Sequence, residues 1–217
     1  MSRLKLLAIF LFVANILNIS AQEQEVYKVS YNLNNNILKT NPLTPLWGPI
    51  NLTGEYRIAL ETRISMKQSI QIGASYLDKS LFLLANEDEI YEDDEPRLII
   101  RGFRFQLAYR IYLIKNDFTG WYFSPMASYA SAKFSYPGYI DKYFLLCIHG
   151  NVNFLLGYQY EMAGGLYLDV FGGLGIRQNV WQEYYIGNQN IIDSPEDFYP
   201  YSGNLKISLG FNVGFGF

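Results

Sequence analysis

Large apolar residues alternate with small or polar ones along most of this chain. In the stretch LKISLGFNVGFGF, every odd position from Leu205 to Phe217 is apolar and every even position is small or polar. Side chains of a β-strand point alternately to two faces, so this spacing predicts a strand with one apolar face. Six further runs share the pattern, and they lie at 50–58, 69–76, 103–113, 121–129, 152–160 and 166–177.

A less regular run from Ile37 to Leu46 predicts an eighth strand, which Pro42 and Pro45 place at an edge or a bend. No helical periodicity follows the first 21 residues. An even number of strands with alternating faces favours a closed antiparallel barrel. The predicted fold class is therefore all-β, an eight-stranded antiparallel up-and-down transmembrane β-barrel.

Charged residues stand opposite the apolar face in nearly every predicted strand. A soluble lipocalin-like barrel turns its apolar face inward, whereas a transmembrane barrel turns it outward toward lipid. Alternation alone leaves both architectures open. In the transmembrane arrangement, eight charged residues are expected to form a polar network in the lumen: Glu55, Arg57, Arg104, Arg110, Glu161, Asp169, Arg177 and Lys206.

Aromatic placement and connection length favour the transmembrane arrangement. Six aromatic residues fall at the same predicted strand ends, as an interfacial girdle requires: Trp121, Phe123, Tyr158, Tyr160, Phe215 and Phe217. Tight connections near 61–66, 115–120 and 163–164 alternate with long ones at 77–97, 137–146 and 178–203. Short periplasmic turns and long outer loops are typical of outer-membrane barrels.

The opening residues predict export. Arg3 and Lys5 precede an apolar stretch from Leu6 to Leu17 and small residues ending at Ala21, which is the layout of a secretory signal peptide. The predicted organisation is a signal peptide at 1–21, an N-terminal segment at 22–35 and an outer-membrane barrel at 36–217. The apolar stretch is shorter than the roughly 20 residues of a membrane-spanning helix.

Composition limits the kinds of partner and the covalent links that the chain can have. The chain has 217 residues with 19 Tyr, 15 Phe and 18 Gly, and loss of Arg3 and Lys5 with the signal peptide changes its net charge from −3 to −5. A negative chain is a poor partner for nucleic acid. Cys147 is the only cysteine, so no intrachain disulfide can form.

Several segments resemble a family of small outer-membrane β-barrels of undefined function, with an architecture similar to the eight-stranded OmpA and OmpX barrels. The resemblance covers roughly Ile37 to Phe217, and KTNPL, GEYR and YRIYL carry most of it. It implies a Gram-negative outer membrane and no catalytic residues. The terminal strand also resembles the signal that the barrel assembly machinery reads, which implies that Phe217 is an assembly signal.

Two features are candidates for chemistry. His149 is the only histidine, and HGNVN lacks the His-x-Ser spacing of deacylase-like barrels, so we expect an ordinary hydrogen-bonded histidine. The stretch from Glu87 to Glu95 holds seven acidic residues without EF-hand spacing, so we expect a solvated loop. Weak divalent bridging to lipopolysaccharide is the alternative for that loop.

The expected function is a structural or surface-interaction role of an outer-membrane barrel through its outer loops, without catalysis, cofactor or metal. Its expected surroundings are outer-membrane lipid and lipopolysaccharide. The alternatives are a narrow pore or a barrel that binds lipid or a small ligand, including a soluble periplasmic carrier, and then a lipid-modifying hydrolase at the rim.

Overall fold

The computed structural model describes residues 35–50, 52–87, 96–113, 118–137, 143–185, 188–192 and 204–217. The predicted signal peptide and nearly all of the N-terminal segment lie outside these residues. The described residues form nine strands and a short helix. The strands are β1 (Asn36–Thr40), β2 (Thr53–Ser65), β3 (Gln68–Lys79), β4 (Ile99–Tyr112), β5 (Gly120–Ser135), β6 (Tyr143–Glu161), β7 (Leu166–Tyr185), β8 (Asn188–Ile192) and β9 (Leu205–Gly216).

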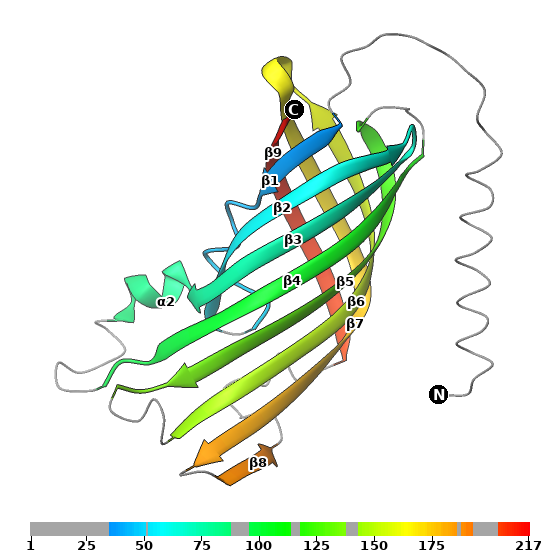
Figure 1. Ribbon diagram of the computed structural model, residues 1–217. Coiled ribbons are helices and arrows are strands. Elements are labelled where there is room, and N and C mark those ends of the chain that lie inside the picture. The colour runs from blue at the N-terminus through cyan, green and yellow to red at the C-terminus, as the bar shows by residue number, and fades with distance from the viewer. Residues whose placement is uncertain are drawn as a thin grey trace, which may run out of the picture. The chain divides into compact units, whose positions relative to one another are not determined.

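Eight of these strands close into an antiparallel up-and-down barrel (Figure 1). Neighbours in the sequence pair from β1 to β7, and β9 lies between β7 and β1. The Asn36 amide donates to the Phe217 carbonyl at 3.1 Å, and the Phe217 amide donates to Asn36 at 2.9 Å. The pairing of β9 with β1 therefore continues to Phe217. The predicted eight-stranded antiparallel barrel is confirmed.

The two ends of the barrel differ in their connections. At one end, Met66 and Lys67 alone join β2 to β3, and a turn at Ala163–Gly165 joins β6 to β7. Gly164 and Gly165 have φ values of 81° and 78°, a backbone region that glycine enters without steric cost. We call this the tight-turn end, and it is uppermost in Figure 1. The long-connection end carries helix α2 (Leu81–Ala85) and β8.

Three sequence predictions about element boundaries were wrong. The weak first strand ends at Thr40 instead of continuing to Leu46, because Pro42 and Pro45 cannot donate to a ladder. Helix α2 interrupts a stretch expected to contain no helix, and the Ser80 hydroxyl caps it by accepting from the Leu83 amide. The expected connection at 178–203 instead contains a hairpin of β7 and β8 beyond the ring.

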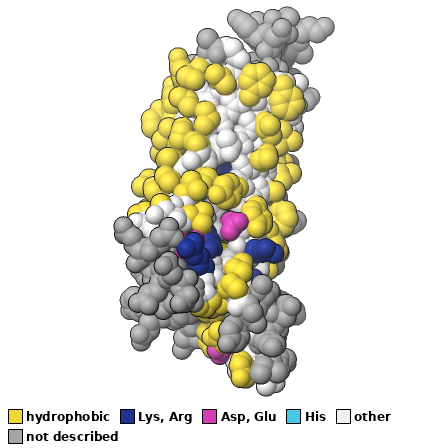
Figure 2. Space-filling model, turned by 90° about the vertical axis from the view of Figure 1, so that its left-hand side faces the viewer, with side chains coloured by type: hydrophobic (Ala, Val, Ile, Leu, Met, Phe, Trp, Pro, Cys, Tyr) yellow, Lys and Arg dark blue, Asp and Glu magenta, His cyan; other side chains and the backbone are white. Residues whose placement is uncertain are grey.

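The barrel wall is apolar on its outside. On β4, Phe103, Phe105 and Leu107 are 45%, 56% and 56% exposed, while Arg104 and Gln106 between them are buried. Hydrophobic side chains cover the upper part of the face in Figure 2, and charged side chains gather below them. The outer wall and the interior therefore have opposite polarity, and the polar side is the inner one.

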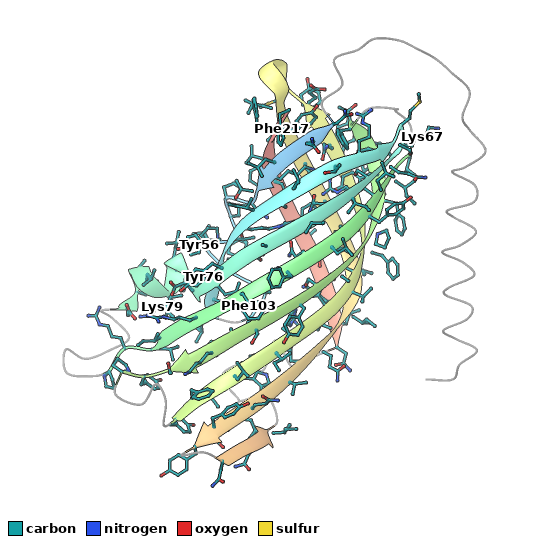
Figure 3. All side chains as sticks on the ribbon, viewed as in Figure 1. Tyr56, Lys67, Tyr76, Lys79, Phe103 and Phe217 are labelled. Atoms are coloured by element: carbon teal, nitrogen blue, oxygen red, sulfur yellow. The ribbon has the colours of Figure 1, made fainter. Side chains whose placement is uncertain are left out.

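Exposed aromatic residues form a row near each end of the wall. The six residues predicted for a girdle are all exposed at the tight-turn end, where Trp121 and Tyr158 meet edge to face at 5.4 Å. At the other end, Tyr56, Tyr76 and Phe103 are direct neighbours across β2, β3 and β4 (Figure 3). Strand rise and a typical barrel tilt put about 20 Å between the two rows along the barrel axis.

Candidate functional site

A cluster of four buried ions fills the interior near the tight-turn end. Lys39 pairs with Glu61 and, at 3.2 Å, with Asp169. Arg110 pairs with the same two carboxylates, at 3.3 Å to Glu61 and 2.8 Å to Asp169. Two cations and two anions balance, and all four side chains are at most 3% exposed. We call Lys39, Glu61, Arg110 and Asp169 the four-ion cluster.

Neutral side chains also donate hydrogen bonds to the carboxylates of this cluster. The Tyr112 hydroxyl donates to Glu61 at 2.7 Å, and the Tyr122 hydroxyl donates to Asp169 at 2.5 Å. The Asn212 amide donates to the second oxygen of Asp169 at 2.9 Å. Buried charges are tolerated when they are both paired and hydrogen-bonded. Each ion of the cluster is paired and makes at least one hydrogen bond, while Glu61 Oε2 and Arg110 Nε have no hydrogen-bond partner among the described residues.

Aromatic rings close the barrel beside the four-ion cluster. Ile37, Tyr112, Phe118, Tyr122 and Tyr167 form a buried cluster at the tight-turn end. The Arg63 guanidinium lies 4.5 Å from the centre of the Phe118 ring. The Arg110 guanidinium lies 4.3 Å from the centre of the Tyr122 ring, so a cation–π contact joins the cluster to the rings. This end of the barrel is filled by side chains.

A second charged group lies farther toward the long-connection end. Arg104 pairs with Glu55 at 2.7 Å and donates to the Ser128 hydroxyl at 3.1 to 3.2 Å. The Ser75 hydroxyl also donates to Glu55, at 2.6 Å. Arg57 donates to the Asn212 side chain at 3.3 Å, and its Nε has no hydrogen-bond partner among the described residues. Cations outnumber carboxylates here.

A cavity of about 650 Å³ lies beside this second group. Arg57, Arg104, Arg177, Lys206 and Glu55 all contribute to its lining. Apolar residues line other parts of it, including Met126, Leu155 and Phe171. A cavity of this volume is in the usual range for small-molecule sites.

His149 lies inside the barrel within a series of amide side chains. Its Nδ1 is 2.6 Å from the Asn179 side-chain oxygen, and its Nε2 is 2.9 Å from the Asn151 side-chain nitrogen. Asn151 in turn donates to Ser128 at 2.7 Å. Both ring nitrogens of His149 therefore face amides, and the Ser128 hydroxyl of this series is bonded to Asn151 and Arg104. The geometry is that of a structural histidine.

Apolar side chains fill the interior at the long-connection end. Ile100, Phe134, Cys147 and Trp181 form a buried cluster there, together with Leu83 of α2. The Phe134 and Trp181 rings are 5.8 Å apart. Helix α2 therefore contributes its one buried side chain to the closure of this end.

The structure places most of the predicted lumen residues inside. Glu55, Arg57, Arg104, Arg110 and Asp169 are buried. Arg177 and Lys206 are half-buried against the cavity.

The prediction for Glu161 was wrong. It is the last residue of β6, so its side chain passes the rim and is exposed although its position in the alternation points inward. The side chain of Phe217 points outward and is 58% exposed. Its role in assembly stays a prediction.

Sequence reasoning missed two members of the four-ion cluster. Glu61 was assigned to a tight connection, but β2 continues to Ser65 and buries it completely. Lys39 lies on the short β1, whose irregular pattern hid its inward position. Extending the alternation of Glu55 and Arg57 by two further steps reaches Glu61, so a signal for that residue was present.

The expectation of a fully solvated acidic stretch was wrong for its first residue. Glu87 is buried and pairs with Lys79, and its other oxygen is 3.8 Å from Arg97. The remaining residues of the stretch, 88–95, lie outside the described residues. In the described ranges, no three or more His, Cys, Asp and Glu side chains lie together in a group that could hold a metal ion.

The described part of the chain contains no helix that is long and apolar enough to cross a membrane. Comparison of the whole chain with protein-family models, with curated proteins and with solved structures gave no match.

Proposed function

We propose that this chain is an integral outer-membrane β-barrel protein, exported by its signal peptide and similar in architecture to the OmpA and OmpX barrels. The single observation that supports this most strongly is the polarity of the wall. Leu107, Phe105 and Phe154 are more than half exposed outside, while Arg104 and Arg110 are buried inside. In water this arrangement exposes apolar surface and buries charge, both of which cost free energy. When lipid surrounds the wall, the exposed apolar surface no longer contacts water and its cost in free energy is removed.

The two rows of exposed aromatic residues support the same proposal. Tyr and Trp favour the interfaces of a bilayer, and an apolar band of about 25 Å separates them in known barrels. The roughly 20 Å between the rows here approaches that height. We expect the tight-turn end to face the periplasm and the long-connection end to face the medium.

The proposed role is structural or one of surface interaction, without catalysis. The closed ends and the four-ion cluster support a barrel that does not conduct, so a pore is the weaker alternative. At the long-connection end, the β7–β8 hairpin extends beyond the ring and exposes Tyr185 and Ile191. Outer-membrane lipid and lipopolysaccharide are the proposed surroundings of the wall.

Substitution of outward leucines tests the proposal. Leu107→Arg places a charge in the middle of the wall, and its cost in lipid should be about 2 to 4 kcal/mol. The matched control is Leu84→Arg, which changes an exposed leucine of α2 beyond the wall and should cost about 0 to 1 kcal/mol. The measurement is urea unfolding in phospholipid vesicles, followed by heat-modifiable migration.

Membrane fractionation completes this test. The wild-type chain should sediment with the outer membrane and resist extraction by carbonate. Equal stability of the two arginine variants, together with release of the wild-type chain with periplasmic contents, would contradict the proposal and favour a soluble carrier.

A further inference from the structure

The barrel wall formed by the described residues is incomplete on one side. Because β1 has only five residues, it pairs with β9 only from Val213 to Phe217. Toward the long-connection end, β9 continues to Leu205, and its described pairing there is with β7 alone. Figure 1 shows β1 ending partway along β2 while β9 continues. Between β2 and β9, strand pairing therefore stops halfway along the wall.

The chain that follows β1 forms hydrogen bonds with the backbone of β2, but among the described residues it does not pair with β9. The Glu55 amide donates to the Thr44 carbonyl at 2.8 Å, and the Thr44 hydroxyl donates to the Glu55 carbonyl at 2.7 Å. The Thr40 hydroxyl donates in the same way to Arg57 at 2.7 Å. Among the described residues, no backbone hydrogen bond joins this segment to the 205–212 part of β9.

The edge of β9 that has no strand partner among the described residues presents backbone groups to this opening. Hydrogen bonds of an antiparallel ladder alternate between the two sides of a strand. Phe217 bonds to Asn36 of β1, so every second residue before it also directs its amide and carbonyl to the β1 side of the strand. Beyond the end of β1, the residues that do so toward the open side are Phe211, Leu209, Ile207 and Leu205. Unpaired backbone groups are expensive in hydrocarbon. A ligand with oxygen acceptors would lower that cost.

The cavity passes through the wall at this place. Its lining includes Lys206 and Ser208, which point inward from β9. It also includes Leu205, Ile207 and Leu209, which point outward and are 67% to 82% exposed. Both faces of one strand can line a single cavity only where the cavity opens beside that strand. Trp47 and Pro49 line the opposite side of the opening.

The charges around the cavity favour an anion. The four-ion cluster is neutral, and among the other described lining residues the cations Arg57, Arg104 and Lys206 face the carboxylate of Glu55. Within the described part of the chain, the Lys206 ammonium makes no hydrogen bond or ion pair, and the charged groups that act on it are Arg104, Glu55 and Arg177. Arg57 and Arg104 are buried and Lys206 is half-buried, and such an excess of cations is costly without an anionic partner.

We propose that the cavity binds the phosphate head group of an anionic phospholipid, which enters sideways through the opening between β2 and β9. Lys206 and the guanidinium groups contact the phosphate, which suits their donors. The acyl chains stay outside the wall along Leu205, Ile207 and Leu209. This inference rests on the proposed membrane location, because only a barrel within a bilayer presents its side opening to lipid.

Native mass spectrometry of the full chain tests the inference. The protein is reconstituted with phosphatidylglycerol, or with phosphatidylcholine as a zwitterionic lipid of equal chain length, and then released into a neutral detergent. We expect one retained phosphatidylglycerol, with at least a tenfold preference over phosphatidylcholine. Lys206→Met removes the ammonium while keeping an unbranched chain, and it should reduce this retention at least tenfold.

Lys67→Met is the matched control, because Lys67 is exposed at the tight turn between β2 and β3 (Figure 3) and is not among the residues that line the cavity. It should retain phosphatidylglycerol as the wild type does. Inorganic phosphate is added as a separate arm. If millimolar inorganic phosphate displaces phosphatidylglycerol and the protein binds the two equally well, the lipid assignment is overturned in favour of a site for free anions.

Two further outcomes also overturn the inference. One is equal retention of the two lipids by the wild-type chain, and the other is unchanged retention by Lys206→Met. Heat-modifiable migration of each sample shows whether the barrel has inserted. An inserted barrel without lipid preference refutes this inference alone, whereas a chain that never inserts refutes the proposed membrane location with it.

Discussion

The two halves of the barrel interior solve the problem of buried charge in different ways. In the tight-turn half, Lys39 and Arg110 face Glu61 and Asp169, and every charge has an opposite neighbour. In the other half, the described lining of a cavity holds the cations Arg57, Arg104 and Lys206 with the carboxylate of Glu55. The first half is self-sufficient and closed by rings. The second half, which we call the open half, has an excess of cations among its described residues, and its described strand pairing between β2 and β9 is incomplete.

The strongest test of this contrast removes one charge from the closed half. Asp169→Asn keeps the shape of the side chain but leaves Lys39 and Arg110 with Glu61 alone. Breaking a buried pair by removing one partner costs about 3 to 5 kcal/mol. We expect a loss of that size in the free energy of unfolding, measured by urea titration in vesicles. A loss below about 1 kcal/mol would mean that the four-ion cluster is not a unit.

The closing rings can be tested without changing any charge. A methyl group at Gly157 would lie 2.3 Å from the Tyr122 ring, so Gly157→Ala must displace the ring whose hydroxyl donates to Asp169. Overpacking of this kind costs about 1 to 3 kcal/mol. Gly150→Ala on the same strand meets nothing within 4 Å and serves as the control. Urea titration of both variants should separate them, and equal stabilities would argue against a tightly packed seal.

The open half should respond in the opposite direction. Lys206→Met removes an ammonium that has no hydrogen bond or ion pair among the described residues, so in lipid without net charge it should stabilise the barrel by about 1 kcal/mol. The comparison is Lys39→Met in the closed half, which should destabilise it. If both lysine variants lose stability to the same extent, the two halves do not differ as described.

Most of the fold could be predicted from the alternation of apolar and polar residues along the strands. Because a strand repeats every two residues, the inward positions of Arg104, Arg110 and Asp169 followed once one face was assigned to lipid. The pattern failed where local chemistry overrides it. Pro42 shortened β1, and the rim exposed Glu161. Alternation also says nothing about closure, so an opening that results from one short strand could not be foreseen.

Which charged side chains pair inside the barrel could not be predicted from the sequence either. Lys39 and Asp169 are 130 positions apart, and their contact depends on the register of β1, β9 and β7 together. Register arises from the sum of many cross-strand contacts, which a single sequence does not display. Composition and parity could therefore predict a polar interior, but they could not predict which half of it would balance its charges.

Oxygen accessibility along β5 tests most directly whether the apolar wall faces lipid. Single cysteines are placed from Phe123 to Tyr129 in a Cys147→Ala background, spin-labelled and reconstituted in phospholipid vesicles. Labels at Phe123, Ala127 and Tyr129, which are outward positions, should relax strongly with oxygen and weakly with a water-soluble nickel chelate. Labels at Ser124 and Met126, which line the cavity, should show low oxygen relaxation. The reverse pattern, or equal relaxation on both faces, would contradict the account.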